Sequence, residues 1–144
     1  MKIIIGADHG GFELKKQLNG YLTESGHEVE DVGNFEMDPD DDYPNICFSL
    51  TKKVVETGGR GILVCGTGIG MSIAANRIKG IRAALVHNES TAKMSREHND
   101  SNVLCLGGRI LDSELAKKIV KTWLETEFTG GRHKRRIDKM ENGC

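Results

Sequence analysis

The stretch Ile62-Leu-Val-Cys-Gly-Thr-Gly-Ile-Gly-Met-Ser-Ile-Ala-Ala-Asn-Arg77 decides the fold that we expect for this chain of 144 residues. It opens with a short apolar run of the kind found in buried parallel strands. A turn that contains three glycines follows, and a helix-forming segment begins at Ile73. A strand, a glycine turn and a helix start in this order direct several backbone N–H groups toward one point, where an anion or an oxyanion is favoured.

A thiol, Cys65, stands where the strand meets the glycine turn, and the hydroxyl of Thr67 follows two residues later. Thiols near a helix N-terminus lose their proton more readily than free thiols, and the resulting thiolate is a base or a nucleophile. A buried structural thiol is the competing interpretation. The glycines and the threonine that follow directly favour a functional role for Cys65.

Apolar segments with strand-like and helix-like periodicity alternate along the rest of the chain. They predict strands at 3–7, 28–32, 62–64, 81–86 and 103–106, and helices at 12–22, 45–57, 90–98 and from Asp112 onward, besides the helix after the glycine turn. Such alternation produces right-handed crossovers and a parallel sheet. We therefore predict one α/β domain over residues 1–144, a three-layer α/β/α sandwich with a five-stranded, parallel, Rossmann-like sheet. Residues 129–144 are expected to be a basic tail with little apolar surface.

Ligands of such sheets bind beyond the carboxyl ends of the strands. The polar side chains that follow the predicted strands are Asp8, His9, Cys65, Thr67 and Arg109. His98 and Asn99 close the helix before the last strand, and we assign them to the same mouth. One crevice is therefore expected to hold acid–base groups, a thiol, a hydroxyl and a cation.

Other sites explain the sequence less well. A dinucleotide fingerprint needs G-x-G-x-x-G, and Met71 stands where its third glycine belongs. A Walker loop fails because no Lys-Ser or Lys-Thr pair follows the glycines. A zinc site formed by His9, His98 and Cys65 lacks ligand spacing, so we expect no metal. The basic cluster at 132–136 fits a solvated tail, a weak nucleic-acid patch or the capture of one phosphate.

Composition narrows the cellular context. The formal net charge of -1 gives no overall attraction to nucleic acid or to an anionic membrane. The apolar N-terminal run is too short for a signal peptide or a membrane span. No CxxC pair occurs among the four cysteines, so we expect reduced thiols and a cytoplasmic protein.

Taken together, these residues resemble the family of type B ribose-5-phosphate isomerases and galactose-6-phosphate isomerase subunits. The resemblance covers nearly the whole chain, and its strength comes from six short motifs in the right order. The matching segments are Gly6-Ala-Asp-His-Gly-Gly11, Asp42-Tyr-Pro44, Cys65-Gly-Thr-Gly-Ile-Gly70 with Ile73-Ala-Ala-Asn76, His98-Asn-Asp-Ser-Asn-Val-Leu104, Gly107-Gly-Arg109 and Gly130-Gly-Arg-His133.

The resemblance implies an aldose–ketose isomerase that interconverts ribose 5-phosphate and ribulose 5-phosphate without a cofactor. Cys65 would be the base that moves a proton through an enediolate, and His98, with Asp8, would open the sugar ring. Thr67 and the N–H groups of the turn would stabilise the enediolate oxygen. The substrate-binding residues implied are His9, Tyr43, Gly66, Gly68, Gly70, Asn99, Arg109, Arg132 and Arg136.

The resemblance also implies a homodimer or a dimer of dimers with shared active sites, to which tail residues 129–144 contribute. Three alternatives stay open at this point. Within the enzyme class, the substrate could be allose 6-phosphate or galactose 6-phosphate. From other classes, a phosphocysteine component of a sugar phosphotransferase and a nucleotide-binding regulatory module also fit a cysteine or a glycine loop at a strand end.

Overall fold

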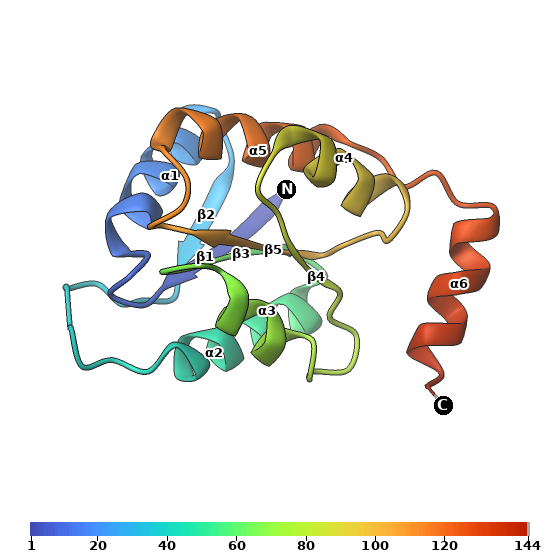
Figure 1. Cartoon of the computed structure of the whole chain (residues 1–144), viewed down its shortest axis with the longest axis horizontal. Helices are drawn as coiled ribbons and strands as arrows, with labels where there is room; N and C mark the ends of the chain where they lie inside the picture. The colour runs from blue at the N-terminus through green and yellow to red at the C-terminus, as the bar shows by residue number, and fades with distance from the viewer. Residues whose placement is uncertain (144) are drawn as a thin grey trace.

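Helices cover both faces of a five-stranded sheet in the computed structural model, which describes residues 1–143 (Figure 1). In chain order the elements are β1 (Lys2–Ala7), α1 (Phe12–Glu24), β2 (Glu28–Asp31), α2 (Tyr43–Thr57), β3 (Arg60–Cys65), α3 (Ile69–Ala75), β4 (Ala83–Leu85), α4 (Glu89–Glu97), β5 (Val103–Gly107), α5 (Ser113–Glu125) and α6 (Arg132–Glu141). The predicted three-layer α/β/α fold is confirmed.

The sheet is parallel throughout, with strand order β2-β1-β3-β5-β4. The chain leaves β1 toward β2 on one side, and it returns to place β3 on the other side. The order therefore reverses between β1 and β3, and in open α/β sheets ligands bind at such a switch point. Asp8 and Cys65 stand at this point, directly at the ends of β1 and β3.

Alternation along the strands divides the apolar side chains between two cores. Ile5 and Val64 belong to the core under α1, α4 and α5, whereas Ile4 and Leu63 belong to the core under α2 and α3. Figure 1 shows these helix layers above and below the sheet. The same alternation turns Cys65 toward α2 and α3, so the side of the sheet on which the thiol lies follows from its strand position.

The core under α5 contains a polar anchor at its centre. Trp123 is fully buried, and its indole N–H donates to the Ser101 hydroxyl at 2.8 Å. The Arg60 guanidinium lies 5.4 Å from the centre of the indole ring and donates to the carbonyls of Trp123 and Leu124. A buried indole N–H needs such a partner, because an unsatisfied donor would cost about 1–3 kcal/mol.

Two helices begin earlier than the sequence pattern predicts. Helix α3 starts at Ile69, directly after the turn, and so includes Gly70. A glycine inside a helix lowers helix stability by about 1 kcal/mol relative to alanine, so Gly70 was assigned to the turn. In the structure the absence of a side chain at Gly70 makes room for the Tyr43 ring, because a Cβ there would lie 2.6 Å from that ring. Helix α2 begins at Tyr43, with Pro44 in its first turn, where proline is tolerated.

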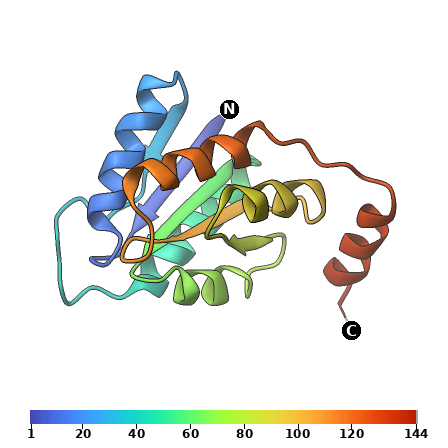
Figure 2. The same cartoon turned by 45° about the horizontal axis from the view of Figure 1, so that its top comes forward.

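The basic tail is helical from Arg132 to Glu141 and packs on its own chain. Ile137 is buried, and Arg82 Nη1 lies 2.7 Å from Glu141 Oε1. The sequence did not predict this helix, because its two apolar residues, Ile137 and Met140, give a weak periodic signal among many charges. Figure 2 shows α6 standing at the edge of the sandwich, joined to α5 by an extended segment.

Within residues 1–143, no helix combines the length and the apolar character that crossing a membrane requires. The described cysteines, Cys47, Cys65 and Cys105, are free thiols. Cys144 lies outside the described residues.

Replacing Trp123 with Phe should lower the free energy of unfolding by about 2–3 kcal/mol, because a cavity forms and the Ser101 hydroxyl loses its donor. Urea denaturation followed by circular dichroism measures this change. Val55→Ala serves as the control, since Val55 is 53% exposed and its truncation should change stability by less than about 0.5 kcal/mol. Equal stability of Trp123→Phe and the wild type would contradict the anchoring role of the indole.

Candidate active site

The carboxyl ends of β1, β3 and β5 are tied together by backbone hydrogen bonds. The N–H of Asp8 donates to the carbonyl of Val64 at 3.3 Å, and the N–H of Gly108 donates to the backbone carbonyl of Cys65 at 2.7 Å. The N–H of Arg109 donates to the carbonyl of Gly66 at 2.9 Å. These contacts bring the residues that follow three different strands into one continuous surface, as the rule for parallel sheets predicted.

The Cys65 thiol lies at the centre of this surface and is only 5% exposed. Its sulfur accepts a hydrogen bond from the N–H of Gly68 at 3.1 Å. Gly68 reaches this position with a φ of 80°, and a Cβ there would lie 2.6 Å from the Leu85 side chain. Only glycine fits this left-handed position without strain, so the turn needs Gly68 to direct an amide at the sulfur.

Two other side chains frame the glycine turn. A Cβ at Gly66 would meet Arg109 Nη1 at 2.9 Å, so the guanidinium lies directly against the turn. The Tyr43 ring covers Gly70 from the other side. Thr67, between them, is exposed, and its hydroxyl accepts the N–H of Ile69 at 3.3 Å. A small polar molecule on this rim can therefore meet amide, hydroxyl, phenol and guanidinium groups together.

Asp8 is a buried carboxyl group beside this rim. It is 6% exposed, and it accepts the N–H of Gly11 at 3.2 Å. Burial raises the pKa of Asp8 above its ordinary value, and the neighbouring Asp41 carboxylate raises it further. A carboxyl group that holds its proton at higher pH is suited to general acid–base transfer.

His9 pairs with an acid that the sequence did not single out. His9 Nδ1 lies 2.7 Å from Asp41 Oδ1, and the His9 backbone N–H donates to the same oxygen at 3.2 Å. The hydrogen bond to Asp41 raises the pKa of His9 above its ordinary value. Asp41 belongs to a run of acids in a loop, and no spacing in the sequence distinguished it from its neighbours.

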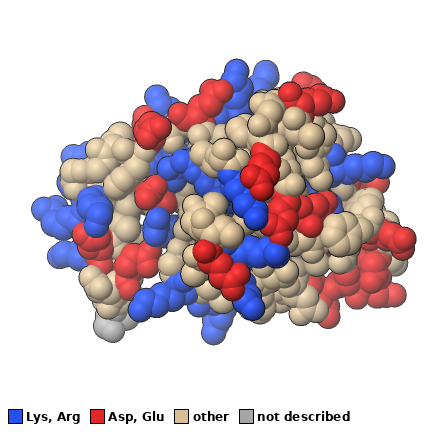
Figure 3. All heavy atoms as spheres, turned by 180° about the vertical axis from the view of Figure 1, so that it is seen from behind, with Lys and Arg blue, Asp and Glu red and all other residues tan. Residues whose placement is uncertain are grey.

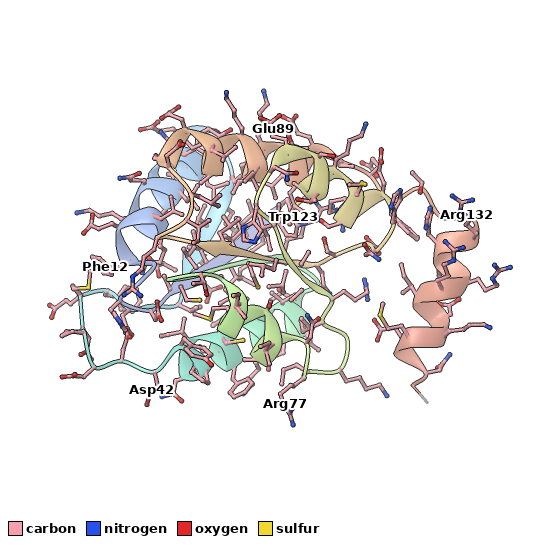
Figure 4. All side chains as sticks on the ribbon, in the orientation of Figure 1. Phe12, Asp42, Arg77, Glu89, Trp123 and Arg132 are labelled. Atoms are coloured by element: carbon pink, nitrogen blue, oxygen red, sulfur yellow. The ribbon has the colours of Figure 1, made fainter. Side chains whose placement is uncertain are left out.

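His98 and Asn99 lie at the opposite edge of the sheet, between α4 and α6. They line a cavity of about 330 Å³ together with His133 and Arg136. The rings of His98 and His133 stack with centroids 4.4 Å apart and an interplanar angle of 14°. Figure 4 shows Arg132, on the same helix α6, at the end of the molecule opposite Phe12 and Asp42.

The expectation that His98 and Asn99 share a mouth with Cys65 in one chain was therefore wrong. A crossover helix runs antiparallel to the strands that it connects, so the C-terminal end of α4 lies at the amino edge of the sheet. Arg132 and Arg136 belong to the same distant group. Within the part of the chain that the structure describes, Cys65 has His9 and Arg109 near it, and the other four residues are remote.

Among residues 1–143, one group could offer ligand atoms to a metal ion, namely Asp8, His9 and Asp41, whose ligand atoms lie within 4.8 Å of one another. The hydrogen bonds of these side chains to each other and to Gly11 already explain why they gather. The zinc ligands considered from the sequence do not form a group, because His98 lies at the other edge of the sheet.

Burial separates Cys65 from the other described thiols. Cys47 and Cys105 have no exposed surface, and burial raises the pKa of Cys47 to about 12 and that of Cys105 well above its ordinary value. Both stay in the core under α2 and α3, away from the polar rim. The amide contact and the access to the rim are therefore features of Cys65 alone among these three thiols.

Comparison with known proteins gives this arrangement a family. The sequence profile of the family described as Ribose/Galactose Isomerase matches residues 3–140. The chain belongs to the ribose/galactose isomerase family. The resemblance inferred from the sequence motifs is thus confirmed.

Relatives in this family match over more than nine tenths of their length. Ribose-5-phosphate isomerase B of Escherichia coli is 45% identical, and the match covers 96% of this chain and 93% of that protein. The solved structure of ribose-5-phosphate isomerase B from Clostridium thermocellum is similar with a TM-score of 0.96 and 48% identity, covering 99% and 96% of the two chains. The Mycoplasma genitalium enzyme, solved with bound ribulose-5-phosphate, is similar with a TM-score of 0.95 and 43% identity, covering 98% and 94%.

The raised pKa of Asp8 predicts a pH-dependent cost to stability. The folded state binds this proton more tightly than the unfolded chain does. The cost is therefore absent below the ordinary carboxyl pKa of about 3.9, grows as the pH rises and is complete above the raised pKa. Asp8→Asn keeps the acceptor for Gly11 and should raise the free energy of unfolding at pH 8 by about 1 kcal/mol, with little gain at pH 4.

Urea denaturation at several pH values measures this difference. Glu36→Gln is the matched control, because it removes a carboxylate from an exposed position and should give no pH-dependent gain. A gain of equal size at pH 4 and pH 8 would show that charge burial at Asp8 is not the cause.

Proposed function

We propose that this protein is an aldose–ketose isomerase that interconverts ribose 5-phosphate and ribulose 5-phosphate. The observation that carries the proposal is the Cys65 sulfur, held at a strand end by the Gly68 N–H at 3.1 Å and bordered by amide and hydroxyl donors. Proton removal next to a carbonyl needs a base together with donors directed at the oxygen that becomes negative. The family and its relatives support the same reaction.

In the proposed reaction the Cys65 thiolate removes the proton from carbon 2 of the open-chain aldose. The electron pair moves onto the carbonyl oxygen at carbon 1, and an enediolate forms. The proton of the carbon 2 hydroxyl passes to the oxygen at carbon 1, and the thiol returns its proton to carbon 1. The product is the ketose, with the carbonyl at carbon 2, and the Cys65 thiolate is regenerated. Thr67 and the N–H groups of the turn would donate to the enediolate oxygen, and one such donor is typically worth about 3–4 kcal/mol.

The closed sugar ring must open before this proton transfer. We assign this step to His98 together with Asp8, whose raised pKa suits a group that gives and takes a proton. These two residues lie at opposite edges of the sheet, because His98 lines the cavity between α4 and α6. The assignment therefore requires the His98 of a second copy of the chain.

The charges at the two ends of the molecule support such an exchange. Helix α6 carries five basic and two acidic residues in its sequence RHKRRIDKME. Figure 3, viewed from behind, shows acidic side chains gathered at the end opposite α6, where the loop between β2 and α2 lies. If α6 of one copy reaches the Cys65 site of another, opposite charges meet. Arg132 and Arg136 would then join His9 and Arg109 around the phosphate, with Tyr43 and Asn99 contacting the sugar.

The phosphocysteine carrier fits the geometry less well. A carrier must offer its cysteine sulfur to a partner protein, whereas Cys65 is 5% exposed and lies behind the glycine turn. The six-carbon substrates, allose 6-phosphate and galactose 6-phosphate, would use the same catalytic groups. A coupled assay with ribose 5-phosphate and these two sugars separates the candidates, and ribose 5-phosphate should give the highest kcat/KM.

Cys65→Ala should reduce kcat for ribose 5-phosphate by at least about 10²–10⁴-fold, since it removes the base of the proposed proton transfer. The fold should persist, as circular dichroism will show. Cys47→Ala is the control, because it removes a fully buried thiol from the same core and leaves the site unchanged. Near-normal turnover by Cys65→Ala would rule out the thiol as the base.

Mixing two inactive variants tests the shared site. Cys65→Ala and His98→Asn should each have low activity on the closed sugar, but subunit exchange would create one intact site in each mixed dimer. Random exchange of equal amounts should restore about a quarter of the wild-type sites. Mixing either variant with itself gives the baseline. If activity stays at the baseline after exchange, verified with a tagged subunit, then each chain completes its own site.

A further inference from the structure

The loop between β2 and α2 contains one acid that differs from the rest. Glu36, Asp38, Asp40 and Asp42 are exposed, as expected for acids in a loop. The side chain of Asp41, in contrast, is only 6% exposed and turns inward. Burying a carboxylate costs solvation free energy unless hydrogen-bond partners replace the lost water, and Asp41 has two such partners.

The first partner of Asp41 fixes its position. The side-chain amide of Asn34 donates to Asp41 Oδ2. Asn34 is in turn fixed, because its backbone N–H donates to the carbonyl of Ala7 at 3.0 Å and its carbonyl accepts the amine of Lys15. Lys15 is buried on α1 and also donates to Asp31 at 3.0 Å. A continuous set of hydrogen bonds thus connects α1 and β1 to the carboxylate of Asp41.

The second partner is His9, whose ring nitrogen Nδ1 lies 2.7 Å from Asp41 Oδ1. The ring is 32% exposed, so its other nitrogen, Nε2, stays available to a ligand. An imidazole whose Nδ1 is bonded to a carboxylate is fixed in orientation and presents an N–H at Nε2. The charged groups that face His9 are Asp41 from this loop, Asp8 at the end of β1 and Arg109 after β5.

These three groups act on His9 in opposite directions. The guanidinium of Arg109 disfavours a second positive charge nearby, and it lowers the pKa of His9. The hydrogen bond to Asp41 raises that pKa and is the largest contribution, whereas the Coulombic contribution of Asp8 is smaller. The hydrogen bond to Asp41, aided by the negative charges of Asp8 and Asp41, therefore lets an imidazolium lie beside the guanidinium of Arg109.

We propose that Asp41 is a positioning residue that holds His9 in its cationic form, with Nε2–H directed at the phosphate group of the substrate. This inference rests on the proposed function only for the identity of the ligand as a sugar phosphate. A cationic His9 beside Arg109 forms charge-assisted hydrogen bonds to phosphate, which are stronger than those of a neutral imidazole. Asp41 itself stays behind His9 and does not touch the ligand.

The first measurement is an NMR titration of the His9 ring in the wild type and in Asp41→Asn, with His9→Gln used to assign its signal. Asparagine keeps the shape and an acceptor for Nδ1 but removes the charge. The titration midpoint of His9 should fall in Asp41→Asn, stay unchanged in the control Asp40→Asn and return toward the wild-type value in Asp41→Glu. Asp40 is exposed on the same loop, so its variant tests for a general loss of negative charge.

The second measurement is the Kd for inorganic phosphate at pH 6 and pH 8 in the same variants. Each unit by which the His9 midpoint falls leaves about tenfold fewer cationic rings at high pH. Asp41→Asn should therefore bind phosphate about three- to tenfold more weakly at pH 8 and within about twofold of the wild type at pH 6. In a His9→Gln background, Asp41→Asn should have no further effect.

An unchanged His9 midpoint in Asp41→Asn would overturn the proposal. An equal loss of phosphate affinity at pH 6 and pH 8 would also overturn it, because such a loss indicates a structural role for Asp41. A lowered midpoint without any change in phosphate affinity would also overturn it. Turnover of ribose 5-phosphate by the wild type is assayed separately. Its absence would refute the proposed function, while the titration and the phosphate affinities would still decide the role of Asp41.

Discussion

The hydrogen bond from the Gly68 N–H to the Cys65 sulfur joins the end of β3 to the start of α3. A strand and a helix can meet this closely only if the residue between them adopts a left-handed conformation, which Gly68 does. The turn is held from below by the sheet, where β1 and β5 flank β3 in register. The thiol, the amides of the turn and the Arg109 guanidinium therefore have positions set by strand ends, whereas the Tyr43 phenol comes from the first turn of α2.

Much of the fold and part of the site could be predicted from the sequence. The apolar runs at β1, β3 and β5 are fully buried strands, and this burial makes their pattern continuous and easy to find. The rule for strand ends then located Asp8, Cys65 and Arg109 together. These predictions succeeded because they depend on local patterns and on one general property of parallel sheets.

The remaining parts depend on contacts between distant segments, and no local pattern reports them. Asp41 matters because it meets His9, 32 residues away, and the sequence shows it only as one acid among several. Helix α6 has one buried residue, Ile137, which is too few for an apolar period to indicate a helix there. His98 was misplaced because closeness to β5 in sequence does not give the edge of the sheet. Helix α4 runs antiparallel to the strands, so its C-terminal end lies at their amino ends.

The polar groups of the site conflict with the stability of the protein that carries them. Asp8 is buried at a cost to its ionised form, and the charge of the neighbouring Asp41 adds to that cost. If stability alone determined the residues at these positions, we would expect apolar side chains or fully paired charges there. The surrounding structure offsets this cost through the large apolar cores on both sides of the sheet.

The placement of the three described thiols has a consequence for chemical selectivity. Oxidants and alkylating agents react with thiolates, and a raised pKa keeps Cys47 and Cys105 protonated at neutral pH. Residues of identical chemistry are thereby separated into two that stay inert and one, Cys65, that a reagent entering from the rim can meet. Among the described thiols, a mild electrophile should accordingly modify Cys65 and leave the two thiols of the interior intact.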